Sequence, residues 1–170
     1  MTAPTCDRDR STVAAARSVV ADVPDPEVPV LTIDDLGVLR DVQIDGAGTV
    51  HVTITPTYSG CPAMDVIRDD VRTALEHAVW QTVEIHTVLS PAWTTNWMSD
   101  AGKAKLRMYG IAPPSSAVRG SQSVTLALSV RCPQCDSLDT RELSRFGSTA
   151  CKSLWVCHSC TEPFDHFKAI

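Results

Sequence analysis

Two pairs of cysteines near the C-terminus constrain the fold of this chain more than any other feature. The pair "CPQC" contains Cys132 and Cys135, and the pair "CHSC" contains Cys157 and Cys160. Each Cys-x-x-Cys turn can direct two sulfurs to one point, and two such turns complete the tetrahedral four-thiolate shell that Zn²⁺ accepts. An iron–sulfur cluster or a redox dithiol could use the same residues. The number and spacing of the cysteines are more typical of a zinc ribbon, so we predict a structural zinc ion bound by all four.

A closed four-thiolate site leaves no coordination position for a substrate. We therefore expect the zinc ion to stabilise a β-rich ribbon of about 50 residues, which is too short to maintain a fold through its own core. Phe164 and Phe167 are predicted to form that core. Cys151 is expected to pack beneath the ribbon, and His158 and His166 are expected at its surface, because the four cysteines leave them no role as ligands.

The preceding part of the chain alternates between helical and strand-like periodicity, which predicts a small α+β sandwich with a hairpin and a third strand covered by helices. Residues 111–122 have the proline-, serine- and glycine-rich composition of a linker. We therefore predict an α+β domain over residues 11–110 and the zinc ribbon over residues 123–170. The predicted elements of the first domain are a helix over 11–22 capped by Ser11, strands over 38–44, 50–54 and 82–89, and helices over 62–80 and 99–110.

Composition excludes several classes of function. The net charge of -5 at pH 7, with no basic patch, argues against binding to nucleic acid. No apolar segment is long enough to span a membrane, and charges occupy the place where a secretory signal would need its apolar stretch. We therefore expect a cytoplasmic protein that binds neither nucleic acid nor membrane. In that compartment the cysteines are expected to be thiols or metal ligands rather than disulfides.

One cysteine, Cys61, lies in "TPTYSGCPAM", where a predicted strand gives way to a helix. Pro62 is favoured in the first turn of a helix, which makes Cys61 a candidate N-cap at the positive end of the helix dipole. A sulfur in that position is biased toward the thiolate, the form that binds metals and attacks electrophiles. A small buried side chain is the alternative interpretation of Cys61. Cys6, near the N-terminus, is predicted to be incidental.

Several segments resemble the PaaD family, which supplies an accessory subunit of the phenylacetyl-CoA 1,2-epoxidase system. These segments are "DPEVPVLTIDDLGVLRDVQI", "VTITPTYSGCPAM", "VLSPAWTTNWMSDAGKAKLRMYGIAPP" and the cysteine-rich ribbon, in that order. The first part is also similar to the small iron–sulfur assembly proteins that include SufT. The resemblance implies an α+β iron–sulfur-assembly-type domain followed by a β-rich zinc ribbon.

The same resemblance implies an accessory protein rather than an enzyme. Its expected task in phenylacetate catabolism is to assist maturation of an iron–sulfur or di-iron centre in the reductase or oxygenase component of the epoxidase. The family's functional cysteine falls on Cys61, and its acidic motif falls on Asp25 and Glu27, so these three residues are candidates for binding transient iron or a cluster. A homodimer is one way to supply further ligands. Asp25 and Glu27 could equally hydrogen-bond the backbone of their own turn.

Two alternatives follow from the remaining residues. Trp93 and Trp97 could dock a partner or fold back on the core, and docking would suit a structural subunit of the epoxidase with no chemistry at the isolated cysteine. A thiol-dependent acyl-transfer enzyme is the other alternative, but no cysteine–histidine signature of a nucleophile and its base is visible. His51, His77 and His86 lie in strand or helix patterns without paired carboxylates and are predicted to be structural.

Overall fold

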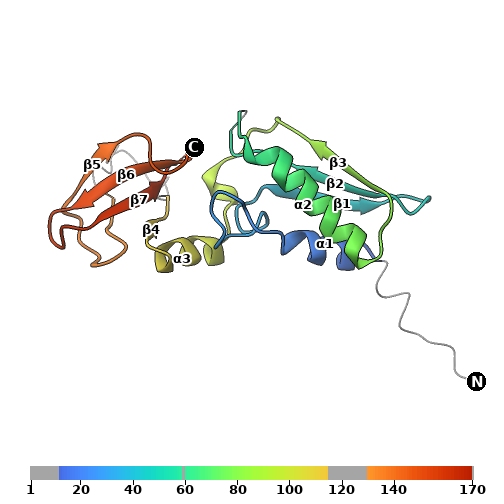
Figure 1. Cartoon of the computed structure of the whole chain (residues 1–170), viewed down its shortest axis with the longest axis horizontal. Coiled ribbons are helices and arrows are strands. Elements are labelled where there is room, and N and C mark those ends of the chain that lie inside the picture. The colour runs from blue at the N-terminus through green and yellow to red at the C-terminus, as the bar shows by residue number, and fades with distance from the viewer. Residues whose placement is uncertain (1–11, 59, 115–129, 170) are drawn as a thin grey trace, which may run out of the picture. The chain divides into compact units, whose positions relative to one another are not determined.

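The computed structural model describes residues 12–58, 60–114 and 130–169 (Figure 1). The chain divides into two compact units, Met1–Trp93 with Trp97–Ser99 and Thr94–Asn96 with Asp100–Ile170. The first unit is α+β and the second carries a β-sheet with one helix, which confirms the predicted fold class. The division assigns helix α3 (Asp100–Met108) to the second unit, whereas the sequence places residues up to 110 in the first domain.

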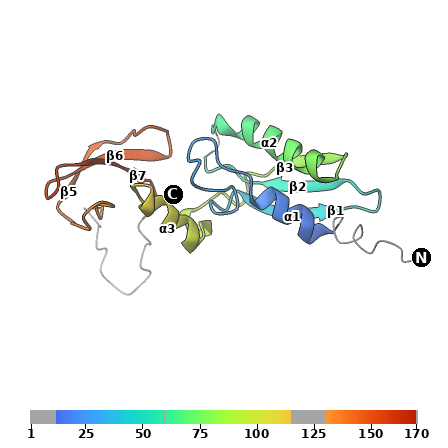
Figure 2. The same ribbon diagram turned by 60° about the horizontal axis from the view of Figure 1, so that its bottom comes forward.

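The first unit is a three-stranded sheet with two helices. Its antiparallel hairpin of β1 and β2 is followed by β3, which returns parallel to β2, so the strand order is β1-β2-β3. Helix α1 packs against β1 and α2, and α2 packs against β3, so both helices cover one face of the sheet (Figure 2). The predicted hairpin, third strand and covering helices are confirmed. The elements are α1 (Val13–Ala21), β1 (Leu39–Ile44), β2 (Val50–Ile54), α2 (Ala63–Ala78) and β3 (Val83–Thr87).

Helix α1 is capped by Thr12 in place of the predicted Ser11, which lies outside the described residues. The Thr12 hydroxyl accepts a hydrogen bond from the Ala15 N–H at 3.2 Å and so satisfies one of the N–H groups at the start of the helix. Ala16 and Val20 are four residues apart and fully buried, which fixes one face of the helix against the core.

The sheet of the first unit has one covered and one open face. Val50, Val52 and Ile54 in β2 are fully buried, whereas His51 and Thr53 between them are partly exposed. Successive side chains of a strand point to opposite faces. The buried side chains therefore face the helices, and His51 lies on the open face.

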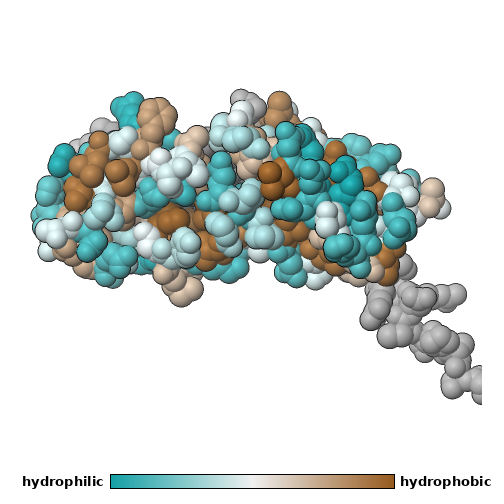
Figure 3. Space-filling view, viewed as in Figure 1, coloured by the Kyte–Doolittle hydropathy of each residue, from teal (hydrophilic) through white to brown (hydrophobic). Residues whose placement is uncertain are grey.

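Helix α2 is amphipathic. Ala63, Ile67, Val71 and Leu75 recur every four residues and are buried. Burying each of the three large side chains contributes about 1.5–3 kcal/mol relative to leaving it exposed. Charged residues occupy the other side of the helix, and the surface over α2 is largely hydrophilic in Figure 3. The buried stripe holds α2 on the sheet and so fixes the loop that leads into it.

The second unit combines α3 with a sheet of strand order β4-β7-β6-β5. The structure differs from the predicted linker at its start, because Ile111 and Ala112 are buried and form β4, which pairs in parallel with Asp165 and His166 of β7. Residues 115–122 lie outside the described residues. The strands are β4 (Ile111–Ala112), β5 (Thr140–Ser144), β6 (Lys152–Cys157) and β7 (Pro163–Phe167), with β6 antiparallel to both β5 and β7.

The core of the second unit is small. Phe164 and Phe167 are 4% and 1% exposed, which confirms the core role predicted for them, and Cys151 is buried as predicted. The cluster around Phe164 is completed by Ala112, Val130, Cys132, Trp155 and Cys157. Two of these residues are cysteines of the predicted zinc site, so the metal site and the core are continuous.

His166, which is predicted to lie at the surface, is half-buried, whereas His158 is exposed as expected. The register of β7 on β6 places His166 opposite Ser153, and the Trp155 ring packs edge-on against the imidazole with centroids 5.8 Å apart. Burial lowers the pKa of His166 to about 4. Its Nε2 is buried and finds no hydrogen-bond partner among the described residues. The same side chain lines an open pocket of about 410 Å³ together with Trp155 and the exposed Phe146.

Candidate functional site

The two Cys-x-x-Cys pairs lie in matching turns of the second unit. The Cys132 N–H donates to the Ser137 carbonyl at 2.9 Å, and the Cys157 N–H donates to the Glu162 carbonyl at 3.0 Å. In both turns the first cysteine is therefore held by a carbonyl on the far side of the turn. These backbone bonds close each turn and position its two sulfurs for a shared ligand.

The four predicted ligands are brought together. All four sulfurs lie within 4.8 Å of one another. Across the two turns, Sγ of Cys132 lies 3.7 Å from Sγ of Cys160, and Sγ of Cys135 lies 3.5 Å from Sγ of Cys157. Four sulfurs placed tetrahedrally at about 2.3 Å from a zinc ion would lie about 3.8 Å apart. The arrangement therefore fits a tetrahedral Zn²⁺ ion.

The thiols also influence each other's ionisation. The backbone N–H groups of Cys160 and Ser159, with the neighbouring thiols, lower the pKa of Cys157 to about 6 against the effect of burial. The N–H of Glu162 lowers the pKa of Cys160, but burial and the other three cysteines outweigh it and raise that pKa to about 12. Once Cys157 has ionised, its thiolate therefore opposes the ionisation of the neighbouring thiols, including that of Cys160. A divalent cation relieves this repulsion, which is a further reason why the site suits a metal ion.

Cys61 lies in the loop between β2 and α2, but it is not the predicted N-cap. Helix α2 begins at Ala63, and Pro62 takes the cap position without a side-chain capping bond. The backbone of Cys61 instead forms a turn before the cap, donating to the Tyr58 carbonyl at 3.2 Å and accepting from the Met64 N–H at 3.4 Å. The argument for a thiolate from the helix dipole is weaker one residue further out. Cys61 is partly exposed, so it does not match the alternative of a buried small side chain either.

Asp25 stabilises the turn in which it lies. Its Oδ1 accepts hydrogen bonds from the backbone N–H groups of Glu27 at 2.9 Å and Val28 at 2.7 Å, and Asp25 is 7% exposed. These bonds favour the turn-forming alternative that the sequence leaves open. Among the residues that the structure describes, Asp25, Glu27 and Cys61 do not form a group whose ligand atoms all lie within 4.8 Å.

The two tryptophans considered for docking lie in different environments. Trp93 is 3% exposed, and its Nε1–H donates to the Leu36 carbonyl at 2.9 Å. Of the two alternatives left open for Trp93, the structure favours folding back on the core, because its indole is buried and its N–H is satisfied there. Trp97, in the 3-10 helix η1 (Thr95–Trp97), is partly exposed, and the Arg40 guanidinium lies 3.5 Å from its ring centre. Trp97 remains a candidate for docking.

His51 and His86 are interpreted as structural because the sequence shows no carboxylates paired with them, and that premise is wrong. Both histidines are paired with the Glu84 carboxylate, and His51 is paired with Asp45 as well. Glu84 and His86 are two residues apart on one strand, and that spacing, beside His51 on a neighbouring strand, could have indicated a shared face. His77, in contrast, is exposed on α2.

Two family models match the chain. A model described as "Iron-sulfur cluster assembly protein" matches residues 14–87, and one described as "PaaD zinc beta ribbon domain" matches residues 117–168. The fold and the four-cysteine site thus define the class of protein, an iron–sulfur-assembly-type domain followed by a zinc ribbon.

Similarity over most of the chain identifies the family. The chain is 47% identical over 153 residues to a putative 1,2-phenylacetyl-CoA epoxidase subunit of Escherichia coli (strain K12), and the match covers 90% of each chain. The chain belongs to the PaaD family, which confirms the resemblance inferred from the sequence.

The first unit has further relatives. It is similar to an "Fe-S protein maturation auxiliary factor" of Bacillus subtilis (strain 168), with 40% identity over 85 residues that cover 49% of this chain and 82% of the relative. The crystal structure of a domain of unknown function from Bacillus anthracis matches with a TM-score of 0.52 and 30% identity, covering 55% of this chain and 90% of that chain. Within the described residues, no helix has both the length and the apolar character needed to cross a lipid bilayer.

Proposed function

We propose that this chain is an accessory protein of a phenylacetyl-CoA 1,2-epoxidase system that assists maturation of an iron–sulfur or di-iron centre through Cys61. The relative named as an epoxidase subunit, which matches over 90% of each chain, supports the system, and the relatives named as maturation factors support the task. The observation that carries the proposal is that Cys61 is partly exposed in the loop leading into α2 and, among the described residues, is not a member of the four-cysteine group.

The chemistry of Cys61 suits iron that is passed on rather than retained. Iron and iron–sulfur clusters favour thiolate ligands, and a single cysteine leaves most coordination positions for other donors. A second copy of the chain or a cysteine of the client protein would supply them. Iron or a cluster is then the cargo of this protein, and zinc bound by the four ribbon cysteines is its structural ion.

A structural subunit that only docks to the epoxidase is the second candidate. Trp97 stacked under Arg40 in the first unit and Phe146, 75% exposed in the second, are side chains that a partner could cover. A thiol-dependent acyl transferase is the third, and it would need a general base oriented toward the Cys61 thiol.

A single set of variants separates these candidates. Cys61→Ser is co-expressed with the epoxidase components without oxygen, and Cys6→Ser serves as a control that also removes one thiol. The readouts are the iron, sulfide and zinc content of the purified accessory protein and the activity of the co-expressed epoxidase. We expect Cys61→Ser to lose iron loading and epoxidase activity while keeping its zinc, and Cys6→Ser to keep all three.

Other outcomes identify the alternatives. If iron loading and epoxidation are unchanged in Cys61→Ser, the maturation role is wrong. Loss of co-purification with the epoxidase in Trp97→Ala, with a silent Cys61→Ser, would support the docking role. A phenylacetyl mass increase at Cys61 after incubation with phenylacetyl-CoA would support the transferase.

A further inference from the structure

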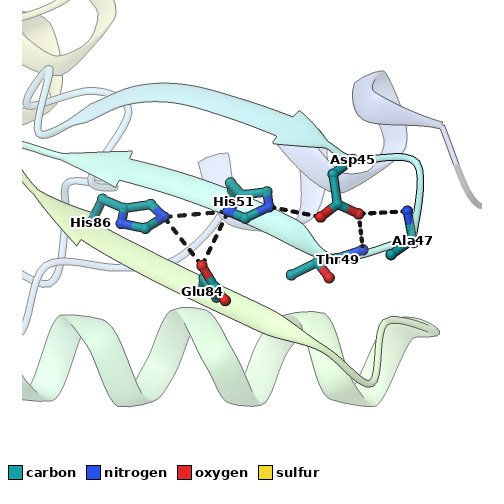
Figure 4. Close-up of polar contacts among 6 residues, drawn as sticks. All are labelled: Asp45, Ala47, Thr49, His51, Glu84 and His86. Carbon is teal, nitrogen blue, oxygen red and sulfur yellow. Dashed lines mark hydrogen bonds and ion pairs between the residues drawn. The ribbon is translucent and has the colours of Figure 1, made fainter.

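The open face of the first sheet carries a cluster of ligand-type side chains (Figure 4). His51 comes from β2, and Glu84 and His86 come from β3. Because β2 and β3 are parallel and pair His51 with Glu84, alternation places all three side chains on the face opposite the helices. The side chain of His51 is partly exposed and those of Glu84 and His86 are exposed, so an ion could reach them from solvent.

The three ligand atoms already have the spacing of a metal site. His51 Nδ1 lies 3.3 Å from His86 Nε2 and 3.4 Å from Glu84 Oε2, and the last two atoms are 3.6 Å apart. Ligand atoms placed tetrahedrally at roughly 2.05 Å from a zinc ion would lie about 3.3 Å apart. The three distances therefore match such an ion. The two imidazole rings are nearly parallel, with centroids 5.6 Å apart, and face each other through these nitrogens, so each ring must also turn to direct its lone pair at the ion.

Asp45 orients the first of these ligands. Its Oδ2 lies 3.2 Å from His51 Nε2, while its Oδ1 accepts backbone hydrogen bonds from Ala47 at 2.8 Å and Thr49 at 2.9 Å. The turn between β1 and β2 thus fixes the carboxylate, and the carboxylate accepts a hydrogen bond from Nε2–H (Figure 4). The lone pair on His51 Nδ1 is then directed toward Glu84 and His86. A carboxylate behind a ligating histidine is the usual outer shell of a protein metal site.

We propose that His51, Glu84 and His86 form a second metal site, which binds a divalent late first-row ion such as Zn²⁺ or Ni²⁺, with Asp45 as its positioning residue. Two imidazoles and one carboxylate favour these ions over Mg²⁺ or Ca²⁺, which prefer oxygen ligands. Three ligands leave at least one coordination position for water or for a donor from another molecule. The site is weaker than the four-cysteine centre, because it is exposed and has fewer ligands. It is independent of the role proposed for Cys61.

Titration of the full chain tests this site. The protein is prepared without a polyhistidine tag, with one zinc ion already bound at the ribbon, and Zn²⁺ or Ni²⁺ is added in a calorimeter. We expect one additional site in the native chain, no measurable binding there in His86→Ala, and a 10–100-fold loss of affinity in Asp45→Asn. His77→Ala removes an exposed histidine of the same unit and should leave the additional site unchanged. Histidine ring signals in NMR spectra should shift for His51 and His86 on Zn²⁺ addition.

Cobalt distinguishes this site from a cysteine site. Co²⁺ added to the zinc-loaded chain should give a ligand-field spectrum without thiolate charge-transfer bands. The proposal is overturned if no additional ion binds, which would leave these residues as surface ion pairs only. It is also overturned if the additional binding survives His86→Ala and disappears in Cys61→Ser. Circular dichroism of each variant shows whether a loss of binding reflects loss of the fold. If His86→Ala loses its fold, the nearly isosteric Glu84→Gln provides the decisive measurement, and it should weaken binding of the additional ion.

Discussion

Asp136 and Thr161 adopt the same left-handed backbone conformation, with φ of 62° and 64°, and each directly follows the second cysteine of its pair. The two Cys-x-x-Cys turns are therefore followed by the same backbone conformation. Asp tolerates this region through its short polar side chain, whereas a β-branched residue such as Thr is strained there.

The strain predicts that Thr161→Gly stabilises the ribbon. Glycine adopts positive φ without a steric penalty, but it also gains more freedom in the unfolded chain, so we expect a net gain of about 0.5–1 kcal/mol. Zinc release during denaturant unfolding, followed with a chromogenic chelator, measures the effect. Thr161→Ala is the matched comparison, because it removes the hydroxyl and the β-branching but keeps Cβ, and it should give a smaller gain than glycine. Equal effects of the two substitutions would show that backbone strain is not the cause.

Removal of zinc should unfold the second unit and leave the first intact. The core around Phe164 is small and contains two of the cysteine ligands, so little apolar burial remains when the metal is lost. Chelation, or Cys135→Ser, is expected to abolish hydrogen-exchange protection in β5, β6 and β7 but not in β1, β2 and β3. Cys151→Ser, which changes a buried cysteine outside the metal group, should keep the zinc. Protection that persists in the metal-free ribbon would contradict this expectation.

The contact of Gly37 with Trp97 predicts a large effect of a small substitution. Gly37 has φ of 70°, and a Cβ at this position would lie 2.5 Å from the Trp97 carbonyl oxygen. Gly37→Ala should therefore destabilise the first unit by about 2–4 kcal/mol through strain and overlap together. Chemical denaturation followed by tryptophan fluorescence measures the loss. In Gly46→Ala the new methyl group meets nothing within 4 Å, so that control should stay within about 0.5 kcal/mol of the native chain.

The parts of the molecule that the sequence predicts are those set by local spacing. The two Cys-x-x-Cys pairs lie in matching turns. The four-residue spacing of apolar residues from Ala63 to Leu75 makes α2 amphipathic regardless of the tertiary fold. The features that it misses depend on tertiary pairing. Trp93 is buried because its N–H meets the Leu36 carbonyl, which is distant in sequence.

Strand register accounts for the missed histidine cluster in the same way. His51 and His86 look isolated in the sequence, and only the parallel pairing of β2 with β3, established by α2 between them, brings Glu84 within reach of both. Cys61 fails as an N-cap for a more local reason. Boundaries of helices are uncertain by one or two residues from sequence, and a shift of one residue moves the sulfur out of the capping position.

The depressed pKa of His166 predicts how acid destabilises the ribbon. The ordinary pKa of 6.5 falls to about 4 in the folded chain, because burial disfavours the charged imidazolium. Between these two values the unfolded chain binds a proton that the folded chain does not. Stability therefore falls as the pH is lowered from about 6.5 to about 4, by at most about 3 kcal/mol from this residue.

Replacing His166 with glutamine should remove that part of the pH dependence. Unfolding by urea is measured for the native chain and His166→Gln at pH 7.5, where the imidazole is neutral in both states, and at pH 4.5. Packing differences between the two chains appear at both pH values, and acid weakens the thiolate ligands of both chains alike. The change in their stability difference between the two pH values thus isolates His166, and it should favour the variant by about 2–3 kcal/mol at the lower pH. An unchanged difference would mean that the imidazole is protonated in the folded ribbon as easily as in the unfolded chain.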